Sequence, residues 1–185
     1  MRNYIVSGAC AAILTTVGMA QAESESEAQH PLSFMFGEWV GEASGFSQTG
    51  PYAITQTERV GPILEGDAVV IEGRGYSDAG DTMFNAFAVV SKTGADGGWE
   101  MRSYAQGRAG TFPFELTENG YVWSVPAGPD ARMVYSATFD GDVWQQTGAY
   151  TPATGEPRQT FQMTLKRTAE TDWPAGNPVS PNVPE

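Results

Sequence analysis

The chain contains one cysteine and one histidine among its 185 residues. Cys10 lies in the first apolar stretch, so the sequence beyond it has no thiol and can form no disulfide. A Ser-His-Asp triad, a histidine-based zinc site and a histidine-ligated haem each need a positioned imidazole. His30 precedes the first predicted strand, and we interpret it as a solvated linker residue. The sequence therefore predicts no catalytic residue, no metal site and no cofactor.

Positive charge is also scarce. Ten Lys and Arg residues stand against 22 Asp and Glu residues, for a formal net charge of -12. Such a surface repels nucleic acids and anionic membranes, so neither is expected as a partner. We expect the acidity to serve the solubility of an exported protein. A more specific alternative is that the negative charge attracts a cationic ligand, but no localised acidic cluster supports it.

No apolar run is long enough for a membrane span. The longest, from Tyr4 to Val17, follows Arg2 and precedes Ala20-Gln21-Ala22, which is the pattern of a signal peptide with its cleavage site. We therefore expect a periplasmic or secreted protein; a lipoprotein anchored at Cys10 is the minor alternative. The predicted organisation is a signal peptide (1–22), a flexible acidic leader (23–31), a β-barrel domain (32–168) and a Pro-rich tail (169–185).

Long helical periodicity is absent, and short alternating segments separated by turn residues take its place. Asn119-Gly120 and Asp140-Gly141 are dipeptides typical of tight hairpins. The predicted strands are 38–46, 52–60, 67–77, 82–92, 98–108, 111–118, 120–126, 131–140, 142–151 and 158–168. Because nearly every connection is a short hairpin and closure removes the exposed edges, we predict an all-β, ten-stranded, antiparallel up-and-down barrel.

The first strand begins with Gly37-Glu-Trp39, where the tryptophan is expected to plug one end of the barrel. Residues 31–36 are predicted to form one short helical turn that caps this end. The strand at 82–92 is apolar on both faces, which suggests cover by a neighbouring segment or a homodimer seam.

A barrel of ten strands has an interior that side chains of moderate size need not fill. Arg102 and Tyr104 share one face of their strand. They either face solvent or line the lumen, where they would clamp a carboxylate or carbonyl. The predicted ligand-binding residues are Trp39, Arg102, Tyr104, Trp123, Tyr135 and Phe161.

Several segments together resemble a family of exported bacterial proteins of unknown function. They are Leu32–Gly41, Gly61–Gly66, Ser103–Gly110, Asn119–Pro129 and Phe161–Arg167. The resemblance implies a lipocalin-like (calycin) barrel, distantly similar to nitrobindin, and carries no established activity. Nitrobindins ligate haem through a histidine near the C-terminal strands, and residues 145–167 contain none.

These features predict an exported barrel that binds a small apolar or amphipathic molecule in its lumen without catalysis. One alternative is a cofactor-independent enzyme, of isomerase, cyclase or hydrolase type, that uses Arg, Tyr and carboxylate groups in the lumen. It requires a lumenal Glu or Asp with a raised pKa near Arg74 or Arg102. The other alternative is an interaction module.

Overall fold

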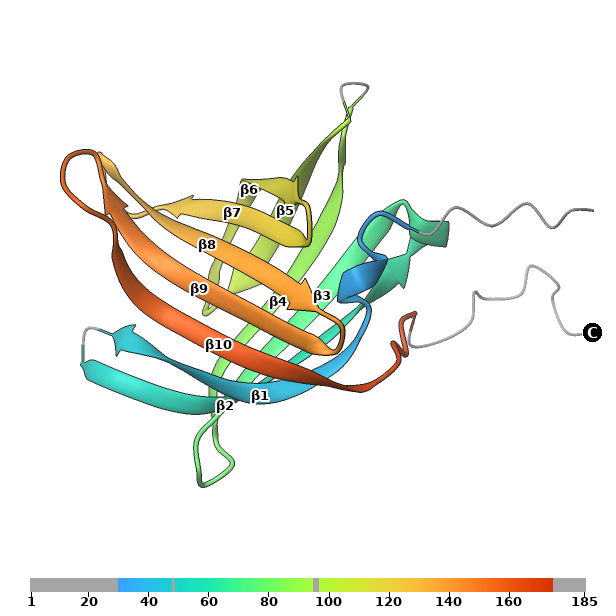
Figure 1. Ribbon diagram of the computed structural model, residues 1–185, viewed down its shortest axis with the longest axis horizontal. Coiled ribbons are helices and arrows are strands. Elements are labelled where there is room, and N and C mark those ends of the chain that lie inside the picture. The colour runs from blue at the N-terminus through green and yellow to red at the C-terminus, as the bar shows by residue number, and fades with distance from the viewer. Residues whose placement is uncertain (1–29, 48, 95–96, 175–185) are drawn as a thin grey trace, which may run out of the picture.

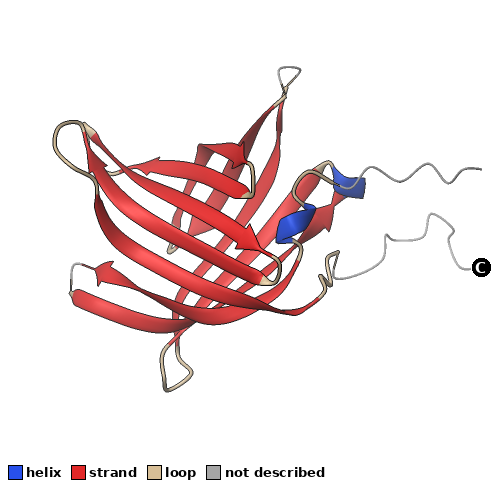
Figure 2. Ribbon diagram, in the orientation of Figure 1, coloured by secondary structure: helices blue, strands red, loops and turns tan. Residues whose placement is uncertain are grey.

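The computed structural model describes residues 30–174 except 48 and 95–96. Ten antiparallel strands follow one another around a closed barrel, and the last strand pairs with the first (Figure 1). Most of the described chain is strand, and the helical turns are confined to one end (Figure 2). The predicted all-β, ten-stranded up-and-down barrel is confirmed. The predicted signal peptide, most of the acidic leader and the end of the tail lie outside the described residues.

The strands lie close to the predicted segments. In chain order they are β1 (Gly37–Ser47), β2 (Gly50–Ile63), β3 (Ala68–Tyr76), β4 (Thr82–Thr93), β5 (Gly98–Ala105), β6 (Arg108–Thr117), β7 (Gly120–Pro126), β8 (Ala131–Asp140), β9 (Val143–Pro152) and β10 (Arg158–Ala169). Two 3-10 turns, η1 (Ser33–Met35) and η2 (Leu64–Gly66), complete the elements.

Two boundaries differ for local reasons. β2 continues past Val60 through Pro62, because its pairing with β1 ends at Val60 and the missing N–H of proline costs no ladder bond on that side. β5 ends at Ala105, earlier than predicted, because Gln106 and Gly107 both adopt positive φ (51° and 74°). Two central residues of this kind make the tight hairpin turn that suits twisted strands.

The seam between β1 and β10 is sealed at the end that carries η1. The Trp39 indole is fully buried and donates a hydrogen bond from Nε1 to the Met35 carbonyl of η1 (2.9 Å). Its ring meets Phe139 and Trp144 edge-on, with centroids 5.6 and 5.7 Å away. Trp39 therefore belongs to an aromatic plug that fills this end of the barrel.

Arg167 of β10 is the cross-strand partner of Trp39 and contacts the plug from the same face of the sheet. Its guanidinium lies 4.2 Å from the Trp39 ring centroid, its Nη2 donates to the Phe34 carbonyl (3.2 Å) and its Nε pairs with Asp142 (3.0 Å). A Cβ on Gly37, whose φ is 139°, would lie 2.7 Å from Arg167 Nη1. Glycine at position 37 thus permits both the turn into β1 and the close approach of the arginine.

His30 is not a solvated linker residue, as the sequence suggested. Its Nδ1 accepts a hydrogen bond from the Leu32 amide (3.0 Å), which leaves Nε2 to donate to the Gly66 carbonyl in η2 (3.0 Å). The imidazole also stacks on Phe36, with centroids 5.4 Å apart. His30 therefore ties the segment before η1 to the β2–β3 connection.

We predict that Trp39→Phe lowers the free energy of unfolding by about 1–3 kcal/mol, because it removes packed ring atoms and leaves the buried Met35 carbonyl without its donor. Urea unfolding followed by circular dichroism measures the change. Val40→Thr is the matched control, since Val40 is the next residue and faces outward; its effect should stay within about 0.5 kcal/mol. Equal effects of the two substitutions would contradict the assigned role of Trp39.

Candidate functional site

A cavity of about 800 Å³ occupies the barrel beyond the aromatic plug. Its wall is mostly apolar, with aromatic rings and methionines from strands all around the barrel. Phe46 and Met83 lie at one rim beside the β1–β2 and β3–β4 hairpins, and they are 69% and 58% exposed. The cavity therefore opens at the end opposite η1 and has its floor against the plug.

Three of the predicted ligand-binding residues lie on the cavity wall. Trp123 of β7 stacks on Tyr135 of β8, with centroids 4.5 Å apart and planes 14° from parallel. Phe161 of β10 meets Tyr135 edge-on at 6.1 Å. Their alternation along the strands places them inward, as the sequence pattern indicated. That they contact a ligand stays a prediction.

The other three predicted residues lie elsewhere. Trp39 is in the plug and does not line the cavity. Arg102 and Tyr104 are on the outer wall, where the Arg102 side chain is 64% exposed and pairs with Glu100 (3.0 Å), and Tyr104 is 57% exposed. The prediction that Arg102 and Tyr104 line the lumen and clamp a ligand there is therefore wrong. Met101, Ser103 and Ala105 occupy the inward face of β5 instead.

A carboxyl group that the sequence analysis missed lies at the cavity floor. Glu58 of β2 lines the cavity and accepts a hydrogen bond from Gln56 Nε2 (2.8 Å). Its neighbours across the sheet are Trp39 on β1 and Gly73 on β3. A Cβ on Gly73 would lie 2.8 Å from both carboxyl oxygens of Glu58. Because Gly73 has no side chain, the carboxyl group of Glu58 can occupy the space beside it.

Burial raises the pKa of Glu58 to about 7, and the charge of nearby Glu72 adds to this rise. The hydrogen bond from Gln56 acts in the opposite direction, because it favours the carboxylate. Glu72 itself faces the outer wall, where it pairs with Arg74. At neutral pH the carboxyl of Glu58 is consequently poised between its neutral and charged forms.

The floor contains a second polar group across from Glu58. Tyr121 of β7 donates its hydroxyl hydrogen to Gln146 Oε1 of β9 (2.9 Å). Burial, and then the charge of Glu58, raise the pKa of Tyr121 well above its usual value. The nearby Trp144 Nε1 lowers the pKa of Tyr121 and so offsets part of this rise. The Trp144 N–H nevertheless makes no hydrogen bond within the described part of the chain. The floor thus holds a buried donor without an acceptor.

A signal for Glu58 was present in the sequence. In β2, Tyr52, Ile54, Gln56, Glu58 and Val60 alternate with outward residues, so two polar residues interrupt an inward apolar row. Such an interruption marks a buried polar site once the inward parity is known. In the sequence the charged residues on 98–108 stand out, whereas the faces of 52–60 become evident only in the closed sheet.

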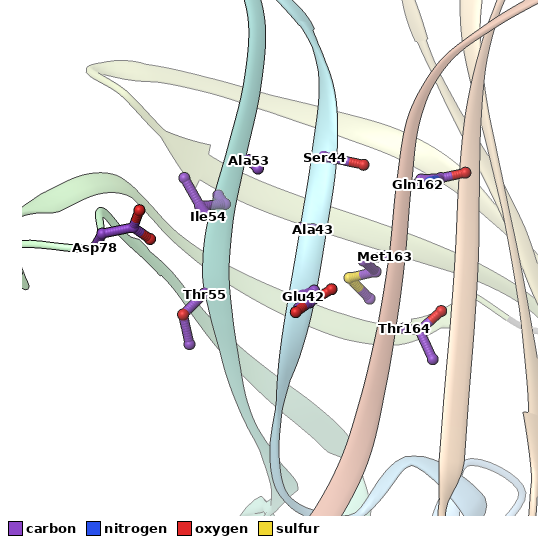
Figure 3. Close-up of a pocket in the computed structure, with 10 residues that line it drawn as sticks. All are labelled: Glu42, Ala43, Ser44, Ala53, Ile54, Thr55, Asp78, Gln162, Met163 and Thr164. Atoms are coloured by element: carbon purple, nitrogen blue, oxygen red, sulfur yellow. The ribbon is translucent and has the colours of Figure 1, made fainter.

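A smaller hollow of about 270 Å³ lies over β1, β2 and β10 (Figure 3). Its polar side chains include Glu42, Thr55 and Thr164, which are paired neighbours across the three strands. They alternate with the lumenal residues, so they lie on the outer wall. Asp78, from the connection between β3 and β4, completes the rim.

Across residues 30–47, 49–94 and 97–174, no three His, Cys, Asp or Glu side chains are grouped to hold a metal ion. In the same ranges no helix has the length and apolar character needed to cross a bilayer.

We predict that Glu58→Gln stabilises the protein more at high pH than at low pH. The folded-state pKa of about 7 exceeds the unfolded value of 4.5, so charging Glu58 costs folding free energy as pH rises from 4.5 to 7. Relative to wild type, the variant should gain up to roughly 3 kcal/mol by pH 8 and little at pH 4.5. Urea unfolding across this range tests it, with Glu100→Gln on the outer wall as the control. A gain independent of pH would contradict the raised pKa.

A second prediction concerns the space beside Glu58. Gly73→Ala should destabilise the wild type by about 1 kcal/mol, because the new methyl group displaces the carboxyl from Gln56. In a Glu58→Ala background the same substitution should be neutral or stabilising, since alanine suits a strand better than glycine. A double-mutant cycle by urea unfolding measures the coupling. Additive effects would show that Gly73 does not make room for Glu58.

The chain matches no family model and no curated protein sequence. Among solved structures it is similar to the crystal structure of Rv2717c from M. tuberculosis, with a TM-score of 0.55 and 13% sequence identity. The match covers 74% of this chain and 94% of that one. At this identity the likeness shows the barrel fold alone. The resemblance to nitrobindin and to an exported family stays a prediction.

Proposed function

We propose that the barrel binds a small apolar or amphipathic molecule in its lumen, without catalysis. The observation that carries this proposal is the 800 Å³ cavity, whose volume lies within the usual range of ligand pockets, about 300–1,000 Å³. Its wall is aromatic and aliphatic, with few polar groups. Such a lining favours an apolar body, and the polar floor suits one polar end.

Export of the protein is part of the same proposal. The N-terminal pattern of positive charge, apolar run and small-residue cleavage site supports a periplasmic or secreted location. An acidic chain with no cysteine beyond Cys10 is compatible with a carrier or scavenger that works outside the cytoplasm.

A cofactor-independent enzyme remains the alternative because one of its requirements has support. Glu58 is a lumenal carboxyl with a raised pKa and has the Tyr121 hydroxyl as a neighbour. The arginines that the alternative invoked, Arg74 and Arg102, are on the outer wall. Conversion of a co-purifying ligand by wild type and not by Glu58→Gln, followed by mass spectrometry, would favour the enzyme.

An interaction module has a weaker basis in the outer row of β4 and β5. Phe87 and Tyr104 are exposed there and pair with each other across the strands. A homodimer through residues 82–92 stays a prediction. Light scattering at high protein concentration distinguishes it from a monomer.

We predict that the neutral dye N-phenyl-1-naphthylamine binds with one site per barrel. Ala86→Trp should weaken this binding at least about tenfold, because Ala86 faces the cavity and the indole would fill it. Asn85→Trp is the matched control, since Asn85 is the preceding residue and is exposed on the outer wall. Fluorescence titration measures both variants. Absence of saturable binding, or equal binding by Ala86→Trp, would refute a lumenal site.

A further inference from the structure

The two charged groups that line the cavity lie at its opposite ends. Glu58 lies at the floor, and Arg158 begins β10 at the open rim, 5.7 Å from the Tyr150 ring. These are the single carboxylate and the single cation among the lining residues. A carboxyl group in an apolar interior without a cation is costly, because charging it there loses the solvation that water provides.

None of the groups directly beside Glu58 supplies that cation, and Arg167, which lies beyond Trp39 on the same face of the sheet, is engaged with Asp142 (3.0 Å). Its paired neighbours on β1 and β3 are Trp39 and Gly73, which carry no charge, and Tyr121 faces it from β7. Glu72 on the outer wall adds negative charge, and Arg74 is engaged with it. Arg59, next to Glu58 in the sequence, faces outward and pairs with Asp172 (3.3 Å).

The rings around Glu58 are suited to a cation. Tyr121 and Trp144 have centroids 6.3 Å apart, and Trp144 packs in turn against Trp39. Aromatic faces beside a carboxylate are a favourable setting for an ammonium group.

We propose that the lumen takes amphipathic amines, with the ammonium group at Glu58 beside the aromatic rings and the apolar body along the wall toward the open rim. This inference rests on the proposed lumenal binding and narrows it to one class of ligand. The ammonium would supply the cation that Glu58 lacks. The overall negative charge of the chain would draw such a ligand toward the barrel.

The test compares three ligands of equal chain length: decylamine, decan-1-ol and decanoate, each displacing N-phenyl-1-naphthylamine. At pH 8 the wild type should bind decylamine at least about tenfold more tightly than decan-1-ol. Glu58→Gln should abolish this preference, so that decylamine and decan-1-ol bind with similar affinity. Glu100→Gln, which makes the same change in net charge on the outer wall, should keep it.

The pH dependence gives a second readout. Because the ammonium binds the carboxylate, the affinity for decylamine should fall as pH drops below about 7, while that for decan-1-ol should not. The ionisable groups that face the site are Glu58 and Tyr121, and the fixed charges around them are those of Arg167 beyond Trp39 and Glu72 behind the wall. Calorimetry in two buffers of different ionisation enthalpy should show proton release for decylamine alone.

The outcomes separate the two proposals. If decan-1-ol displaces the dye and decylamine has no advantage, or if decanoate is preferred, lumenal binding stands and the amine class is overturned. If Glu100→Gln loses the preference as fully as Glu58→Gln, the effect is general charge attraction and the site at Glu58 is refuted. If none of the three ligands displaces the dye, the amine class is overturned, and if the dye itself shows no saturable binding, both proposals fail.

Discussion

The contact of the Trp39 indole with the Met35 carbonyl and the Arg167 guanidinium is the constraint on which the rest of the barrel depends. It joins the first strand, the last strand and the turn before them at one point. A ten-stranded sheet needs such a closure, because β1 and β10 meet only after the whole chain has gone around. The buried hydrogen bond and the cation above the ring make the pairing specific, since few other side chains could satisfy both partners.

Closing one end with large rings determines where the empty space remains. Trp39, Phe139 and Trp144 fill the barrel next to η1, whereas small residues such as Gly73 and Ala86 line the wall beyond them. The cavity is therefore a consequence of uneven side-chain size along the barrel axis. Glu58 lies at the boundary between plug and cavity. There its carboxyl group has apolar side chains on one side and the open cavity on the other. The charged form is therefore destabilised, while the group stays accessible from the cavity.

Much of the fold was predictable from local pattern. The hairpin dipeptides and the period-two alternation identified all ten strands, and the alternation of β7, β8 and β10 placed Trp123, Tyr135 and Phe161 inward. The same reasoning failed for the strand at 98–108. Both faces of this strand carry polar and apolar residues, so the sequence did not show which face points into the barrel. In the structure Arg102 and Tyr104 face solvent. His30 was misread because its hydrogen bond to the Gly66 carbonyl joins segments 36 residues apart, a distance that no local pattern encodes.

The sequence was sufficient for strand order, hairpin positions and the plug, because these follow from turn chemistry and from alternation between neighbouring residues. The polar floor was decided only by the closed barrel. Glu58 and Tyr121 come from strands that are far apart in the sequence and face each other only across the lumen. Whether a glutamate on a strand is an ordinary solvated charge or a buried one depends on the face it occupies and on what lies opposite. Closure of the sheet sets both.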